Sequence, residues 1–389
     1  MKSEDASVIA ITGSHGIMHA YLVLLPALLP LLHGDLGGIA TFGLLVSLVN
    51  WFYGFGSFPV GFMADKMSRK MLVTVSMALL GTASIIVGLS PNIWVAAAGF
   101  IVLGIGASIY HPPGYAHLCL ISDEMRGRYM GYQGMSGDLG MALSYLTTSL
   151  LGAQFGWRAT FIIWGVVGLA TAALDHLVIQ DVACEVDSTR KGVVPTLRKM
   201  FGVADRTTLL LTLVIVVFSG MLWQGVSAYI MVYITDVKMV ALVIAGGLST
   251  LKYTVGAFAQ ILGGDLSDRI GRKVILLAGF SVFTVSLVAL TLAPSNLLVL
   301  AGLVVVLGFA FFITQSTMNA LLGDVSYKDT VGVTYGVNFT LKYGFGFFTP
   351  AIAGYLAVSY GLDYVFYFFA ALSAVAFLLS LFVREGKKN

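Results

Sequence analysis

The sequence predicts an all-α membrane protein with twelve transmembrane helices arranged as two six-helix, pseudo-symmetric bundles. The first observation is composition: 58% of the 389 residues are hydrophobic and 11% are charged, against about 25% charged residues in soluble domains. The second is that apolar residues form long blocks such as "TLLLTLVIVVFSGMLW" and "NLLVLAGLVVVLGFAFFI". A helix that crosses the bilayer needs about 20 apolar residues, whereas the strands of a membrane β-barrel would alternate in polarity.

The apolar blocks define the individual spans. The longest polar stretch follows the sixth span and divides the chain into a first bundle over 1–181, a cytoplasmic linker over 182–206 and a second bundle over 207–389. The predicted spans are 8–33, 41–63, 71–89, 93–118, 127–152, 158–180, 207–235, 243–263, 274–292, 296–322, 331–357 and 362–383.

Lysine and arginine predict the orientation. With both termini inside, the cytoplasmic segments hold 18 of the 22 residues, and the outer loops hold Arg158 and Lys238. Cytoplasmic loops are enriched in Lys and Arg, so we expect a multi-pass protein of the cell (inner) membrane with cytoplasmic termini. The net charge of +3 follows from this topology and does not indicate nucleic-acid binding.

Two sequence patterns recur in the two halves. "GFMADKMSRK" at 61–70 follows the second span, and "GDLSDRIGRK" at 264–273 follows the eighth. "FGWRATF" at 155–161 likewise matches "YGLDYVF" at 360–366, 205 positions on. In the first pattern the matching pairs are 203 positions apart: Gly61 and Gly264, Asp65 and Asp268, and Arg69 and Arg272.

Two tandem six-span units with this loop resemble the major facilitator superfamily over essentially the whole chain. The family pattern G-x-x-x-D-[RK]-x-G-[RK]-[RK] is complete in the second copy, but Ser68 replaces its second glycine in the first. Because a turn with positive φ accepts serine poorly, we expect a less tightly turned first loop. The resemblance implies a gating or inter-helix role for Asp65 and Asp268. The basic residues are equally explained as cytoplasmic anchors.

The resemblance also implies a central cavity lined by spans 1, 4, 7 and 10, so ionisable groups near mid-span are of interest. Lys252 lies in span 8, Lys342 in span 11 and Asp138 in span 5, while His15 and His19 form an i,i+4 pair in span 1. Mid-membrane charges are costly and usually mark function. Lysine snorkelling, an Asp138–lysine pair and histidines bonded to a neighbouring helix remain as structural alternatives.

The two lysines outnumber the single acid, so the sequence favours an anionic substrate. A basic residue in span 8 with a lysine in span 11 resembles oxalate/formate exchangers, and the span 8 residue alone also resembles monocarboxylate transporters. Polar side chains on the cavity-side spans could orient such a ligand. The predicted substrate-binding residues of this kind are Gln224, Gln315 and Asn338.

A second resemblance concerns spans 1 and 4. "GSHGIMHAYLVLLPALLPLL" and "IYHPPGYAHL" are similar to the fosmidomycin-resistance exporters, which have a His-rich first span and a His-Pro pair in span 4. This makes His111 a candidate substrate-binding residue beside Lys252, Lys342, His15 and His19. Pro112 and Pro113 remove helix hydrogen bonds, and the freed carbonyls can line a cavity or simply accompany a kink.

The leading hypothesis is a secondary transporter that moves a small organic anion as an exchanger or with protons, with Asp138 or His19 as the proton-coupling group. The alternatives are a proton-coupled drug or antimetabolite exporter and, less favoured, a non-transporting receptor or assembly subunit. No nucleophile–base set or phosphate-binding loop occurs, so we expect no enzyme and no cofactor. His15 and His19 supply two metal ligands, which is too few for a metal site. We expect a monomer in the lipid bilayer.

Overall fold

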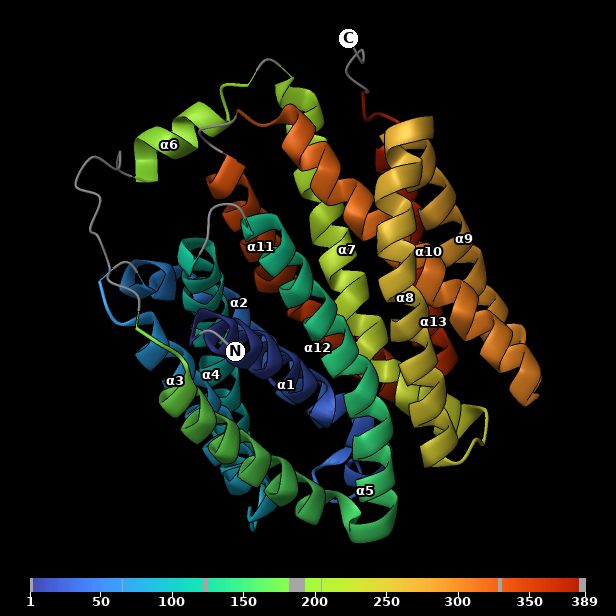
Figure 1. Cartoon of the computed structure of the whole chain (residues 1–389). Helices are drawn as coiled ribbons and strands as arrows, with labels where there is room; N and C mark the ends of the chain where they lie inside the picture. Colours follow the sequence, from blue (N-terminus) through green and yellow to red (C-terminus); the bar gives the residue numbers. More distant parts are fainter. Residues whose placement is uncertain are drawn as a thin grey trace. The chain divides into compact units, whose positions relative to one another are not determined.

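The computed structural model describes residues 3–64, 66–121, 125–181, 193–203, 205–327 and 331–384. Within these ranges the chain forms helices joined by short turns and contains no strand (Figure 1). A helix covers most of every predicted span, so the all-α prediction is confirmed. Asp65, one of the predicted motif residues, lies outside the described residues.

Contacts between Cα atoms divide the chain into two units. The first comprises Met1–Val186 with Ala228–Thr250, and the second comprises Asp187–Ser227 with Leu251–Asn389. In the first unit α1 and α3 pack against α5, and α2 packs against α4. Its complete helices are α1 (Ser3–Leu32), α2 (Gly38–Ala64), α3 (Arg69–Gly88), α4 (Ile93–Ile121) and α5 (Arg126–Val178).

In the second unit α9 packs against both α10 and α13. The helix α7 changes to a π-helix at its end, and this end belongs with the first unit, as does the beginning of α8. The remaining elements are α6 (Val193–Met200), α7 (Arg206–Val232), η1 (Tyr233–Val237), α8 (Leu242–Ile270), α9 (Arg272–Leu292), α10 (Leu297–Val325), α11 (Val331–Gly346), α12 (Phe348–Tyr360) and α13 (Leu362–Ser380). The division into six and six helices stays a prediction.

By length and hydropathy, 10 helices among the described residues are candidate membrane spans. The predicted twelve differ from this number at two places. The helix α5 covers the fifth and sixth predicted spans together, with non-helical backbone at Gly156 between them. The eleventh predicted span is divided at Phe347 into α11 and α12, each shorter than a bilayer-crossing helix.

The outer-loop repeat has the same backbone in both copies. Gly156 has φ 78° and ψ 167°, and Gly361, 205 positions later, has φ 101° and ψ 166°. This region of φ and ψ is essentially restricted to glycine. The glycine in "FGW" and "YGL" is therefore needed to let the chain leave one helix and enter the next.

The inner-loop motif has a different backbone in its two copies. Gly271 precedes α9 with φ 107°, a conformation that requires glycine. Ser68 precedes α3 with φ −54°, and its Oγ accepts a hydrogen bond from the Met71 N–H at 3.1 Å. Serine thus ends the turn and caps the helix. The less tightly turned first loop stays a prediction, because Asp65 of that loop lies outside the described residues.

Proline in α4 leaves a carbonyl that faces a hydroxyl of α2. Pro112 has no N–H, so the Ser108 carbonyl four residues earlier loses its helical donor. The Ser57 hydroxyl of α2 approaches this carbonyl at 3.3 Å, while its shorter bond, at 2.8 Å, goes to the Tyr53 carbonyl of its own helix. The helix therefore continues through Pro112 and Pro113 while holding α2 beside the segment that carries His111.

Candidate functional site

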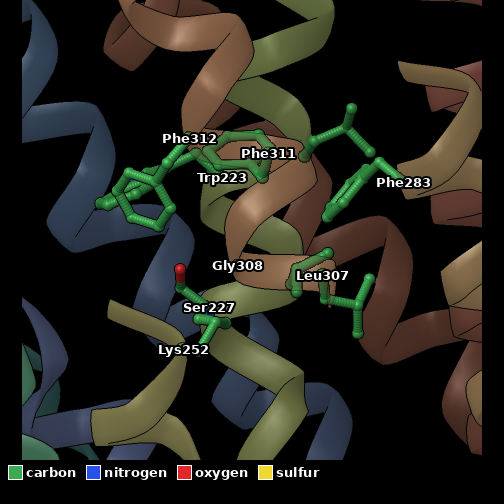
Figure 2. A pocket seen from close by; sticks show the side chains of 10 residues that line it. Trp223, Ser227, Lys252, Phe283, Leu307, Gly308, Phe311 and Phe312 are labelled. Atoms are coloured by element: carbon green, nitrogen blue, oxygen red, sulfur yellow. The ribbon is translucent and has the colours of Figure 1, made fainter. Parts of the chain in front are cut away.

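A small pocket in the second unit surrounds Lys252 on α8. Apolar side chains from α7, α9 and α10 form most of its wall, and it has room for about one water molecule. Figure 2 shows Ser227 and Lys252 on one side of the pocket and the aromatic rings of Trp223, Phe311 and Phe312 on the other. The pocket is thus a mainly apolar space with one ammonium group at its edge.

Close packing of α8 against α10 fixes the position of Lys252. A Cβ atom at Gly308 of α10 would collide with the Lys252 carbonyl oxygen, so this glycine permits the backbones to touch. Lys252 is only 6% exposed, and its Nζ lies 4.5 Å from the centre of the Tyr253 ring. In the described part of the chain, no carboxylate lies within 4.0 Å of this Nζ and no group accepts a hydrogen bond from it.

The second lysine belongs to a polar network that joins three helices. The Lys342 Nζ on α11 donates to Gln315 Oε1 on α10 at 2.8 Å, and Gln315 Nε2 donates to Ser219 Oγ on α7 at 2.8 Å. Gln224 of α7 also contacts α11, because its Nε2 donates to the Tyr343 carbonyl at 3.0 Å. Lys342, Gln315 and Gln224, three predicted binding residues, are therefore brought together.

Trp223 adjoins both lysines. The Lys342 Nζ lies 5.6 Å from the Trp223 ring centre, and the same indole lines the Lys252 pocket. An ammonium group over an aromatic face gains a cation–π attraction. Trp223 therefore connects two cationic groups that are 90 residues apart in the sequence.

Three histidines meet in the first unit. The ring centres of His15 and His19 on α1 are 4.4 Å apart, and they lie 5.1 and 5.3 Å from that of His111 on α4. His15 Nδ1 lies 2.7 Å from the Gln133 carbonyl oxygen of α5, and His111 Nε2 lies 2.6 Å from the Tyr53 hydroxyl of α2. Four helices thus hold the three rings.

The three histidines and the group Ser219, Trp223 and Gln315 occupy equivalent positions in the two halves of the sequence. Adding 204 to 15, 19 and 111 gives 219, 223 and 315, which are Ser219, Trp223 and Gln315. The first two lie on α7 and the third on α10, just as the histidines lie on α1 and α4. The repeat therefore places histidines in one unit where the other has the Ser219–Gln315 hydrogen bond.

The last two predicted site residues lie on α11 and α5. Asn338 on α11 and Asp138 on α5 are both half-buried. A carboxyl group that sequence reasoning missed lies elsewhere on α5: Asp175 is 1% exposed, and neither carboxyl oxygen has a hydrogen-bond partner among the described residues. Because Asp175 is near the end of a predicted span, the sequence suggests a place at the membrane–water interface. Its burial becomes evident only from the packing of the helices.

The inner-loop motif forms an ionic contact in the second unit. The Arg272 guanidinium lies 2.6 Å from Asp268 of α8 and 3.0 Å from Asp324 of α10. Arg69, its counterpart, is buried. A Cβ atom at Gly61 or Gly264 would meet none of the described atoms within 4 Å. The gating role of the motif stays a prediction.

Comparison with known proteins now identifies the family. The family model described as Major Facilitator Superfamily matches residues 12–349. The chain belongs to this superfamily. The structure is similar to that of a bacterial homologue of the human lysosomal transporter Spinster in an inward-facing, unoccupied conformation, with a TM-score of 0.86, 16% identity and 100% of each chain covered. The nucleoside transporter NupG gives a TM-score of 0.82 at 11% identity, with 99% of this chain and 100% of that chain covered.

Curated relatives of this superfamily member are more similar in sequence. An uncharacterised MFS-type transporter of Bacillus subtilis, YwfA, is 24% identical, with 94% of this chain and 88% of that protein covered. A probable sulfoacetate transporter of Cupriavidus necator, SauU, is 26% identical (91% and 88%). A putative proline/betaine transporter of Staphylococcus aureus is 24% identical (91% and 81%). The protein is thus a multi-pass membrane protein of a transporter family, consistent with the expectation that it is not an enzyme.

Proposed function

We propose that this superfamily member is a secondary transporter of small organic anions, operating by alternating access as an exchanger or with proton coupling. The observation that carries the proposal is Lys252, an ammonium group in an apolar pocket without a carboxylate partner in the described residues. Burying an isolated charge is costly, and a bound anion would offset that cost. Because the pocket has room for about one water molecule, the anion would bind in a more open conformation of the alternating-access cycle.

Lys342 and the cargo of the relatives support the same chemistry. The network around Gln315 holds the Lys342 ammonium beside Trp223, which adds a second positive charge near the indole that lines the pocket. The relatives are named as transporters of sulfoacetate and of proline or betaine. All three compounds carry a carboxylate. We therefore propose a carboxylate or sulfonate as the group recognised by the lysines.

The proposal includes the topology predicted from the sequence. We infer a monomer in the cell (inner) membrane with both termini cytoplasmic and with the bundles 1–181 and 207–389 joined by the linker 182–206. Labelling of single cysteines introduced at residues 36 and 188 tests this topology, because the two positions are predicted to react from opposite sides of the membrane. Reaction from the same side would contradict it.

A ligand screen tests the function. The purified protein is heated in the presence of monocarboxylates, dicarboxylates, sulfonates, phosphonates and cationic drugs, and the best ligands are then assayed for counterflow in proteoliposomes. We expect anions to raise the melting temperature and Lys252→Gln to weaken their binding ten- to a hundredfold, as expected for loss of a hydrogen bond to a charged group.

Lys238 provides a matched control. It is also 6% exposed, and its Nζ lies 5.5 Å from the Tyr233 ring, but it follows η1 and is outside the pocket. Lys238→Gln should retain anion binding. If only cationic drugs stabilise the protein, the alternative of a proton-coupled drug or antimetabolite exporter replaces this proposal. The buried Asp175 and the three histidines are the observations that favour that alternative.

A further inference from the structure

The histidine cluster contains more ligand atoms than the sequence alone suggests. One ring nitrogen from each of His15, His19 and His111 lies within 4.8 Å of the other two. The sequence shows the α1 pair, but His111 is 92 residues beyond His19 and joins it only through the packing of α4 beside α1. The number of candidate metal ligands therefore rises from two to three.

We propose that His15, His19 and His111 form a binding site for a divalent transition-metal ion, with Zn²⁺ as the best match. Three neutral imidazoles with a fourth position left for water are a recurrent zinc arrangement, and imidazole also suits copper and nickel. This inference goes beyond the proposed transport function and does not depend on the nature of the cargo.

The hydrogen bonds of His15 fix its ring in the state that a metal requires. The Gln133 carbonyl can only accept, so His15 Nδ1 carries the proton and donates across the 2.7 Å contact. Nε2 then carries the lone pair. This nitrogen is buried and has no hydrogen-bond partner among the described residues. A metal-bound histidine characteristically donates its other N–H to a carbonyl in this way.

Tyr53 can fix the protonated nitrogen of His111 as the Gln133 carbonyl does for His15. Its hydroxyl is 2.6 Å from Nε2 and can accept the Nε2 proton, which leaves the lone pair on Nδ1. Space for the rings comes from Gly137 of α5: a Cβ atom there would lie 2.9 Å from His15 Cε1 and 3.1 Å from His19 Nδ1. The α1 backbone is also fixed against α5, because a Cβ at Gly140 would collide with Gly16.

The dimensions of the cluster suit a metal of this size. Zn–N bonds of about 2.0–2.1 Å place tetrahedral ligand nitrogens about 3.4 Å apart. Nitrogens within 4.8 Å therefore need to move by about 1 Å or less toward a common centre, which small ring rotations supply. Neutral imidazoles leave the charge of the ion uncompensated, so the open position would also accept an anion.

The test uses the full-length protein in detergent, with Co²⁺ as a spectroscopic probe and Zn²⁺ as a competitor. We expect one Co²⁺ per chain with the visible bands of tetrahedral coordination, displaced by Zn²⁺. His111→Gln and the less buried His19→Gln should each weaken Co²⁺ binding at least tenfold. His117→Gln is the matched control, since His117 is buried on the same helix outside the cluster, and it should bind Co²⁺ as the unmodified protein does.

A folding defect is separated from ligand loss by a second measurement. Zn²⁺ should raise the melting temperature of the unmodified protein and of His117→Gln, and should leave that of His19→Gln unchanged. The proposal is wrong if the unmodified protein shows no saturable Co²⁺ binding. It is equally wrong if His19→Gln and His117→Gln bind Co²⁺ alike.

Discussion

The Lys342 Nζ lies 2.8 Å from Gln315 Oε1, which couples an ammonium group of α11 to an amide of α10. The Ser219 hydroxyl accepts from the nitrogen of the same amide at 2.8 Å, so the amide oxygen is directed to the lysine. The position of the Lys342 charge therefore depends on a neutral side chain. Gln315 is uncharged, so this contact orients the ammonium without itself cancelling the positive charge.

Gln315→Glu changes this neutral partner into a charged one of nearly the same shape. The new carboxylate should pair with Lys342 and compete with an anionic substrate, so we expect at least a tenfold rise in the dissociation constant. The measurement is a binding titration with the anion that gives the largest thermal shift. Gln260→Glu, which adds the same charge on α8 outside the network, should bind normally. Unchanged affinity in Gln315→Glu would remove Lys342 from the binding site.

Gly156→Ala and Gly361→Ala should each destabilise the protein. Both glycines have positive φ with ψ near 167°, where a residue with a Cβ atom costs about 1–3 kcal/mol. Thermal unfolding in detergent provides the measurement. Gly13→Ala is the control, because Gly13 lies inside α1 and a Cβ atom there would meet none of the described atoms within 4 Å, so alanine should stabilise by up to about 1 kcal/mol. Equal melting temperatures for all three variants would contradict the backbone argument.

Asp175→Asn tests whether the buried carboxyl group of α5 carries a proton. Asparagine keeps the shape and removes the titration, so proton-driven uptake should be lost while counterflow of the same substrate is retained. His176→Asn is the control, since it removes an exposed ionisable group at the next position. Uptake that still responds to a proton gradient in Asp175→Asn would assign coupling to another group, with Asp138 and His19 as the predicted ones.

The stability contributed by the cap at the start of α7 should depend on pH. Asp205, in the predicted linker, accepts a hydrogen bond from the Thr208 N–H at 3.0 Å, and this bond holds the pKa of Asp205 below its usual value. The cap therefore stabilises the fold at pH values above about 3.9, and the contribution is lost as the pH falls through the lower folded-state pKa.

Substitution at Asp205 separates capping from charge. Asp205→Ala should cost about 1 kcal/mol at neutral pH, whereas Asp205→Asn should retain most of the cap. At a pH below the folded-state pKa, the difference between the original protein and Asp205→Ala should shrink. Melting curves at neutral and strongly acidic pH measure this, and a pH-independent difference would mean that the carboxylate has no part in the cap.

The sequence was sufficient where a local pattern determines structure. Continuous apolar runs predicted the helices. It was insufficient where packing decides. The association of His111 with His15 and the burial of Asp175 depend on helices that meet only in the fold. The break at Phe347 does have a local signal, because Pro350 lacks the N–H that would bond to the Gly346 carbonyl, but the continuous apolar run led to the prediction of a single span.

The different backbones at Ser68 and Gly271 also bear on how the two repeats can diverge. At position 68, φ −54° is open to every residue type, so substitutions can accumulate there at the cost of a helix cap. At position 271, φ 107° admits little besides glycine. Under selection for a folded protein, a library randomised at both codons should recover many residues at the first and almost none but glycine at the second. One copy of the repeated loop thus tolerates many residues at this position, while the other is restricted to glycine by backbone geometry.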